Sequence, residues 1–121
     1  MTPHLESTSP QVRGAAAKAL GRMPGSRDAL LAQLRVERNP SVRSYLAQAL
    51  CKQGEPTLAS LEAVNEAVAT EKDVRARFAM ARYLGENLER FPRGRKTLED
   101  VLASETSTRI RRYIAGRIYA K

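Results

Sequence analysis

The chain has 121 residues, of which 42% are hydrophobic, with four Tyr, two Phe and no Trp. This length corresponds to one domain, and a core of Ala, Leu and Val with few rings favours closely packed helices over a sheet sandwich. The formal net charge of +8 favours acidic partners such as nucleic acid, an anionic surface or an acidic protein. Residues 73–121 hold most of this excess, with twelve positive and six negative charges.

The residue inventory excludes several classes of site. The single Cys51 cannot form an internal disulfide, and together with the single His4 it cannot build a zinc site or a Ser-His-Asp triad. Gly-rich phosphate loops are also missing, so we expect no catalytic, cofactor-binding or metal-binding residues. Residues 1–6 do not resemble a signal peptide, and no apolar run approaches the roughly 18 residues of a membrane span. We therefore expect a cytoplasmic protein without a membrane segment.

One phrase recurs four times along the chain, and its clearest copy is Asn39–Leu50. Each copy has an apolar anchor followed directly by an arginine. The anchors are Val12, Val42, Val74 and Ile110, which lie 30, 32 and 36 residues apart. A recurring period of this size indicates a stacked repeat architecture.

Helix-start signals and apolar spacing predict seven helices in chain order. Ser9-Pro10 and Asn39-Pro40 open the first two copies of the phrase, because Ser or Asn caps free N–H groups and Pro is tolerated at the first helical position. The expected caps are Ser9, Asn39, Thr70 or Asp73, and Ser107 or Thr108. Second helices are predicted over residues 26–37, 57–69 and 95–103, with a longer connection before the last of them.

The phrase Asn39–Arg43, with Ala47, Ala49 and Leu50, resembles HEAT-like repeats, particularly the short variety found in phycobilin lyases. The resemblance covers about residues 9–121. It implies an all-α fold, a right-handed α-α superhelix of about three and a half helix pairs, whose second helices line the concave side. We expect an N-terminal tail at 1–8 and a single repeat domain at 9–121, with repeats at about 9–37, 38–70, 71–103 and 104–121.

The arginines after the anchors are the most regular polar feature: Arg13, Arg43, Arg75 and Arg111. They could form a row of anion contacts. The resemblance implies instead that they join adjacent repeats through acidic or carbonyl partners. We favour the second role, because each arginine follows the position expected to be most buried.

Two functions remain open. The first is a non-enzymatic protein-interaction or scaffolding module that binds a partner protein through its concave face. That face would carry Arg27, Gln33, Arg35, Glu62, Asn65, Glu66, Lys96 and Glu99. The alternative is a nucleic-acid-binding module that uses the basic C-terminal third. Its centre would be Arg93, Arg95, Lys96, Arg109 and Arg112, of which Arg93 falls in the connection predicted before residue 95.

The last predicted helix has no second helix after it. Ile110, Ile114 and Ile118 are therefore expected to be covered on one side only, and Tyr113 and Tyr119 lie on the same helix. Terminal repeats normally have a polar outer face. This end is thus predicted to continue into a longer array, or to dock onto a partner or a second copy.

Overall fold

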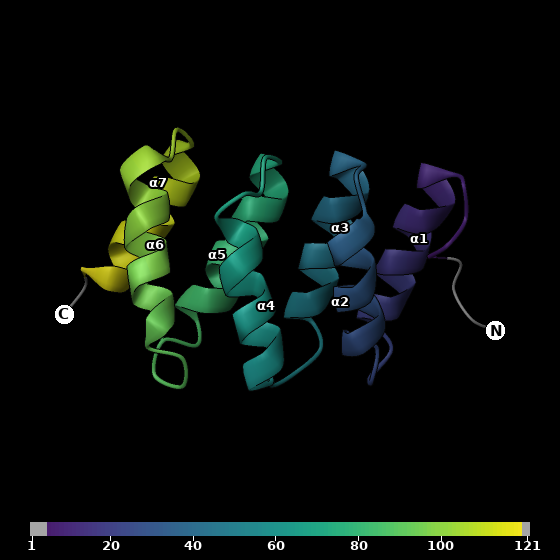
Figure 1. Ribbon diagram of the computed structural model, residues 1–121, viewed down its shortest axis with the longest axis horizontal. Helices are drawn as coiled ribbons and strands as arrows, with labels where there is room; N and C mark the ends of the chain where they lie inside the picture. Colours follow the sequence, from purple (N-terminus) through teal and green to yellow (C-terminus); the bar gives the residue numbers. More distant parts are fainter. Residues whose placement is uncertain (1–4, 120–121) are drawn as a thin grey trace. The chain divides into compact units, whose positions relative to one another are not determined.

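The computed structural model describes residues 5–119, which form seven α-helices and no strands (Figure 1). His4 and Lys121 lie outside the described residues. In chain order the helices are α1 (Pro10–Gly21), α2 (Arg27–Val36), α3 (Pro40–Cys51), α4 (Leu58–Val68), α5 (Val74–Gly85), α6 (Arg93–Ser104) and α7 (Thr108–Ile118). The chain divides into two compact units, which we call unit 1 (up to Pro56) and unit 2 (from Thr57). The predicted all-α fold is confirmed.

The first helix of each predicted repeat begins at a side-chain cap. Ser9, Asn39, Asp73 and Ser107 each accept a hydrogen bond from the backbone N–H three residues later. Pro10 and Pro40 occupy the first turn, where no intrahelical donor is lost. These four starts agree with the expected caps, and Asp73 rather than Thr70 opens α5.

The second helices agree with the predicted segments to within two residues. Thr57 caps α4 and forms a reciprocal capping box with Ser60. The main difference is in α6, which begins at Arg93 and not at Arg95. The observed connection before α6 is therefore shorter than the predicted one. Phe91, with 2% of its surface exposed, is buried and fixes the chain just before α6.

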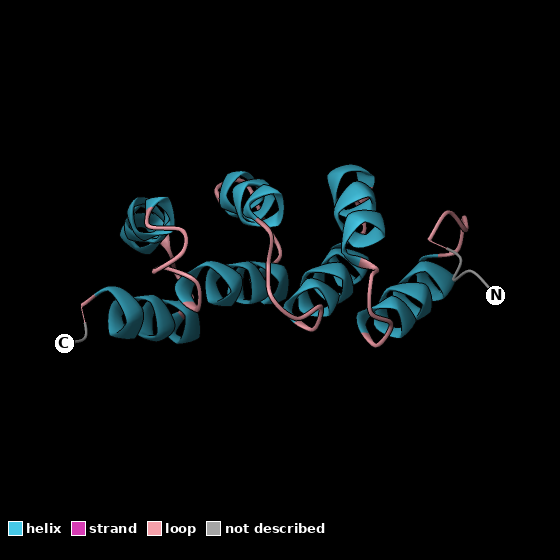
Figure 2. Cartoon of the chain, turned by 90° about the horizontal axis from the view of Figure 1, so that it is seen from below, coloured by secondary structure: helices cyan, strands magenta, loops and turns pink. Residues whose placement is uncertain are grey.

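Unit 1 consists of α1 and α3 side by side, with α2 on one side of them (Figure 2). Small residues allow α1 and α3 to approach closely. A Cβ on Gly14 would lie 3.1 Å from the Tyr45 ring, and one on Gly21 would lie 3.0 Å from the Ala49 Cβ. The backbones of α1 and α3 can therefore approach this closely because the residues at positions 14 and 21 are glycines, which have no Cβ.

Unit 2 has the same two-layer arrangement, with α5 and α7 in one layer and α4 and α6 in the other (Figure 2). Tyr83 on α5 reaches α4, where its hydroxyl lies 2.7 Å from the Ser60 hydroxyl in a buried position. Tyr113 on α7 packs edge-on against Phe78 and lies over Gly85. Here too a glycine makes room for the neighbouring first helix.

Two sequence-based expectations about burial are wrong. Val12 and Val74 are not core anchors, because they are 41% and 45% exposed, whereas Val42 and Ile110 are buried. The isoleucines of α7 are also not open on one side, since Ile110, Ile114 and Ile118 are at most 2% exposed. The α5 and α6 helices cover them, so these isoleucines do not require a longer array or a docking partner.

Candidate interaction surface

The arginine ladder has a different third member from the one predicted. Counted from the helix caps, the third anchor is the buried Ala76, and the arginine that follows it is Arg77. Arg75 lies two residues earlier, with 52% of its side chain exposed and a 3.4 Å contact to Asp73. The corrected ladder is Arg13, Arg43, Arg77 and Arg111, whose last two intervals are both 34 residues.

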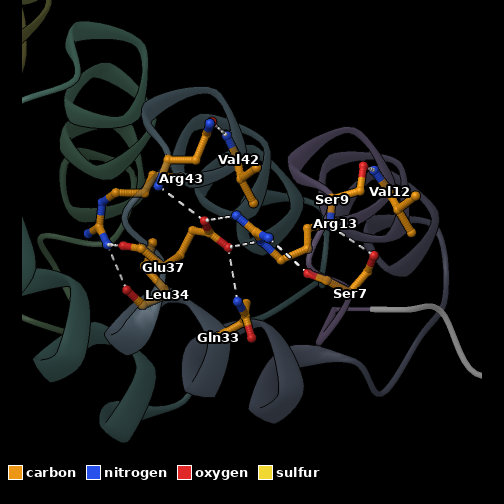
Figure 3. A network of polar contacts seen from close by, with 10 residues as sticks. Ser7, Ser9, Val12, Arg13, Gln33, Leu34, Glu37, Val42 and Arg43 are labelled. Atoms are coloured by element: carbon orange, nitrogen blue, oxygen red, sulfur yellow. Dashed lines mark hydrogen bonds and ion pairs between the residues drawn. The ribbon is translucent and has the colours of Figure 1, made fainter.

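In unit 1 the ladder arginines bind the end of α2 (Figure 3). Arg13 donates two hydrogen bonds to the Glu37 carboxylate, at 2.9 and 3.0 Å, and a third to the Ser7 carbonyl oxygen. Arg43 donates from Nη1 to the carbonyl oxygens of Leu34 and Glu37, at 2.8 and 2.7 Å. The two arginines therefore join α1, α2 and α3 through one buried junction, as the structural interpretation of the ladder requires.

Unit 2 repeats this junction with Arg77, Glu105 and Arg111. Arg77 holds the Glu105 carboxylate at 2.9 and 2.8 Å, while Arg111 donates to the Glu105 carbonyl oxygen at 3.1 Å. The hydrogen bonds from Arg77 outweigh burial and lower the pKa of Glu105 below its ordinary value. In Glu37, burial is the largest influence and raises the pKa, but the donors Arg13, Gln33 and Asn39 together lower it.

The acidic partner of the ladder occupies a fixed position that our sequence analysis missed. Glu37, Glu71 and Glu105 each lie six residues before a ladder arginine, and each accepts the backbone N–H two residues later. Ser7 takes this position ahead of Arg13, and its hydroxyl accepts the Ser9 N–H at 3.1 Å. The 34-residue spacing of the three glutamates was the available signal. We call these three residues the junction glutamates.

Helices α1–α3 and α5–α7 thus share several equivalent side chains. The equivalent pairs are Arg13 and Arg77, Glu37 and Glu105, Arg27 and Arg95, and Tyr45 and Tyr113. The offset is 64 residues in the first pair and 68 in the others, so the four extra residues lie between Gly85 and Arg95, in the connection that contains Phe91 and the start of α6. The regular features of the chain therefore build the scaffold.

Of the predicted partner-binding residues in unit 1, Arg27 is used internally. Its Nη2 donates to the carbonyl oxygens of Gln53 and Glu55, which lie just beyond α3. Arg35 is exposed and makes no hydrogen bond or ion pair with any described residue. Of Arg27 and Arg35, Arg35 is therefore the residue whose side chain is available to an outside partner.

Most of the predicted residues in unit 2 also have internal partners. Glu62 pairs with Arg93 at 2.7 Å, Lys96 pairs with Asp100 at 2.7 Å, and Arg95 donates to the Ile118 carbonyl oxygen. The guanidinium of Arg109 lies 4.1 Å from the centre of the Phe78 ring. Glu66 and Arg112 are exposed and have no such partner among residues 5–119.

The basic residues of the C-terminal third do not form a single group. Arg95 contacts the last turn of α7, whereas Arg109 and Arg112 lie in its first turns. At a rise of 1.5 Å per residue, Arg109 and Ile118 are about 13 Å apart along the helix axis. The structure therefore divides these cations between the two ends of α7.

A hollow of about 420 Å³ lies between the second helices of unit 2, and we call it the α4–α6 hollow. Its lining residues are Asn65, Val68, Ala69, Glu71, Arg77, Thr97, Asp100, Val101, Ser104, Glu105 and Thr106. The Arg77–Glu105 pair contributes to this lining, and Asn65 stands out because its Oδ1 is buried without a hydrogen-bond partner. The predicted surface residue Asn65 therefore lines a cavity in unit 2.

The remaining site predictions concern metals and membranes. In the described part of the chain, no group of three His, Cys, Asp or Glu side chains is placed to hold a metal ion. None of the helices within residues 5–119 has the length and hydropathy needed to cross a bilayer.

Comparison with known families identifies the class of protein that these helix pairs and arginine junctions define. The family model for HEAT repeats matches residues 27–116. The chain belongs to the HEAT repeat family, whose members are typically non-catalytic and commonly serve as protein-interaction scaffolds. No curated protein and no solved structure matches the chain.

Proposed function

We propose that this chain is a non-enzymatic interaction module that binds a partner protein through the exposed surface of its second helices. The observation that carries the proposal is the α4–α6 hollow, a polar concavity between two second helices of unit 2. HEAT repeats commonly act as protein-interaction scaffolds, which supports the same function. Solenoid surfaces of this kind bind by shape and charge and need no reacting group.

The internal contacts of the basic residues favour a protein partner over nucleic acid. Phosphate binding requires cations that can approach the backbone of the nucleic acid together. Arg93 and Lys96 form exposed ion pairs with Glu62 and Asp100. Arg95 donates to the Ile118 carbonyl oxygen in the last turn of α7, whereas Arg109 lies in the first turn of α7 over the Phe78 ring. Only Arg112 of the proposed cluster has no such contact among residues 5–119.

The test is capture of a partner by the immobilised chain from extract of the source cells, with and without nuclease, at about 50 and 200 mM salt. We expect a protein to be retained after nuclease treatment. Reversing the charges of Arg35 and Glu66, two exposed second-helix residues without a hydrogen bond or ion pair among residues 5–119, in the variant R35E/E66K, should weaken its retention. The matched control K72E/E89K changes the same charges on exposed loops and should leave retention unchanged.

Two results would contradict this proposal. One is retention that disappears with nuclease and falls steeply with salt, which would identify nucleic acid as the ligand. The other is retention that falls equally in R35E/E66K and in the control, since the second helices would then have no special role.

A further inference from the structure

The last ladder arginine makes only part of the contacts that its equivalents make. In Arg13 and Arg77, Nη1 donates to the carbonyl oxygen of the residue six positions earlier, at 2.8 and 3.4 Å. Their Nε and Nη2 atoms both donate to the carboxylate of a junction glutamate, as Figure 3 shows for Arg13. The Nη1 atom of Arg111 likewise donates to the Glu105 carbonyl oxygen at 3.1 Å. Its Nε and Nη2 atoms, which we call the Arg111 fork, form no hydrogen bond or ion pair with residues 5–119.

The Arg111 fork has the geometry that binds a carboxylate in its equivalents. The Nη1 atom is anchored at the end of α6, because it donates to the carbonyl oxygens of Leu102 and Glu105. A guanidinium is planar and rigid, so this anchor limits the directions in which the Nε and Nη2 donors can point. Two parallel N–H groups match the two oxygens of one carboxylate. Arg111 is exposed, so a carboxylate from outside can reach the fork.

The charges near Arg111 favour an acidic ligand. The α7 helix contains four arginines and no acidic residue. Two of them, Arg109 and Arg112, are exposed and form no hydrogen bond or ion pair with residues 5–119. The Glu105 carboxylate offsets little of this charge, because it is 2% exposed and is held by Arg77. A positive field of this kind attracts carboxylates.

The same side of α7 carries apolar surface that is buried in α1 and α5. Ala115 is half-buried, whereas its equivalents Ala17 and Ala81 are 0% exposed. Tyr119 is 63% exposed, although glycines at its equivalent positions are buried. These positions of α1 and α5 pack against another helix, α3 or α7. Arg111, Ala115 and Tyr119 are spaced four residues apart and so lie along one side of α7, which we call the α7 stripe.

The junction glutamates show which kind of carboxylate fits an arginine fork in this chain. Glu37 and Glu105 each lie at the C-cap of a second helix, where the backbone becomes extended. Each carboxylate also accepts the backbone N–H two residues later, which fixes it beside the end of the helix. A helix that ends in glutamate can therefore lie on the α7 stripe and place a carboxylate at the fork.

A second copy of this chain does not supply that carboxylate. The glutamates that end its own helices, Glu37 and Glu105, have carboxylates that are 2% exposed and already bound by arginine. If its α1 packed on α7 as the next first helix, the residue six positions before Arg13 would be Ser7, which has a hydroxyl and no carboxylate. The net charge of +8 also opposes the association of two copies.

We propose that the α7 stripe binds a helical segment of a partner protein that ends in glutamate, with the glutamate carboxylate on the Arg111 fork. This goes beyond the proposed function, which concerns the second helices, because the stripe lies on a first helix. Nucleic acid is not the expected ligand, because its phosphates need a row of cations and the other two positions of the stripe are Ala115 and Tyr119.

The test uses three capped helical peptides of alanine and glutamine, each about 16 residues long, that end in Glu-Thr-Ser, Gln-Thr-Ser or Lys-Thr-Ser. The first ending copies residues 105–107. Each peptide is titrated into the isotope-labelled full chain at about pH 6, where glutamate is ionised. We expect the glutamate peptide to shift the Arg111 Nε–H signal and the amides of Ala115 and Tyr119. It should bind about fivefold or more tightly than the glutamine peptide, and the lysine peptide should bind most weakly.

Variants of α7 separate the fork from general charge. Arg111→Lys keeps the charge but loses the fork, so it should bind the glutamate peptide about fivefold or more weakly. The matched control Arg112→Lys makes the same change at the adjacent exposed arginine and should leave binding unchanged. Arg111→Lys also loses hydrogen bonds to α6, so its thermal midpoint is measured alongside. Ala115→Gln leaves Arg111 in place and adds bulk to the stripe, and it should weaken the binding of the glutamate peptide independently.

Four results would overturn the inference. The first is binding of the glutamine or lysine peptide as tightly as the glutamate peptide, or equal losses in Arg111→Lys and Arg112→Lys. The second is an oligonucleotide that shifts the Arg111 Nε–H signal when the glutamate peptide does not, which would identify nucleic acid as the ligand. The third is a dimer in sedimentation that Arg111→Lys dissociates, because the occupant would then be a second copy. The fourth is a glutamate 24 to 28 residues after Arg111 in the protein purified from its source cells, the separation found for Arg13 and Arg77.

Discussion

Replacing Arg77 should destabilise the protein far more than replacing its neighbour Arg75, although both are arginines of the same helix. Arg77→Ala removes both hydrogen bonds from the Glu105 carboxylate, which is 2% exposed. Breaking a buried ion pair by removing one partner costs about 3–5 kcal/mol, because the remaining charge loses its compensation. We expect the Arg77→Ala cost at the lower end of that range, since the Ser107 N–H still binds Glu105 at 3.0 Å.

The control Arg75→Ala should cost less than about 1 kcal/mol, because its side chain is 52% exposed and solvent screens its interactions. Glu105→Gln keeps the shape and one acceptor but loses the charge, so it should cost about 1.5–3 kcal/mol. The double variant R77A/E105Q should cost less than the sum of the single variants by about 0.5–3 kcal/mol, because the first change already breaks the interaction.

Urea unfolding followed by far-ultraviolet circular dichroism gives the free energies by linear extrapolation. Losses of this size are a large part of the roughly 5–15 kcal/mol by which such a domain is stable. Equal losses in Arg75→Ala and Arg77→Ala would refute the corrected ladder. Additive losses in R77A/E105Q would refute the coupling between Arg77 and Glu105.

Two further predictions follow from the same contacts. The pKa values of Glu37 and Glu105 are lowered in the folded chain, so their contribution to stability is present above the unfolded value of about 4.3 and is lost as the pH falls through the folded values. The unfolding free energy should therefore fall between about pH 5 and pH 3, and this slope should flatten in E37Q/E105Q; an unchanged slope would assign the acid sensitivity to other groups. Gly85→Ala would place a Cβ 2.7 Å from the Tyr113 hydroxyl oxygen and should cost about 1–3 kcal/mol in urea unfolding. Gly116→Ala, which has nothing within 4 Å of the added Cβ, should stabilise α7 by about 0.5–1 kcal/mol, and a loss there equal to that in Gly85→Ala would contradict the packing argument.

The helix starts could be predicted from the sequence because each depends on a local interaction. A cap such as Asn39 bonds to an N–H only three residues away, and Pro40 is tolerated in the first turn wherever the helix lies. Local chemistry of this kind is complete within one short segment. The same reasoning holds for Thr57, which caps α4 through its own neighbour Ser60.

The error at Val74 shows where local reasoning is insufficient. Val74-Arg75 and Ala76-Arg77 both fit an apolar residue followed by an arginine, and hydrophobicity favours Val74. Position relative to the cap decides otherwise, because the third residue after Asp73 faces the interior and that residue is Ala76. Helical rotation of about 100° per residue therefore outweighs the greater hydrophobicity of valine.

The candidate site depended even more on tertiary contacts. Asn65 appeared in the sequence only as one of eight polar residues on second helices, with nothing to separate it from Glu62 or Glu66. The structure separates them, because Glu62 pairs with Arg93, Glu66 is exposed, and Asn65 lines the α4–α6 hollow with a buried acceptor. A hollow between two helices depends on how far apart they pack, and no local pattern reports that distance.

The sequence by itself determined the seven helices, the caps of α1 and α3 and membership of a repeat family, because these follow from spacing and from contacts within a few residues. Only the tertiary structure decided which arginines form internal hydrogen bonds and which cations lie far from one another. It also decided which polar side chain lines a cavity. Arg13 finds its partner Glu37 24 residues away, and Arg77 finds Glu105 28 residues away. Such pairings form only when the helices are packed, because packing both removes the competing water and brings the distant side chains together.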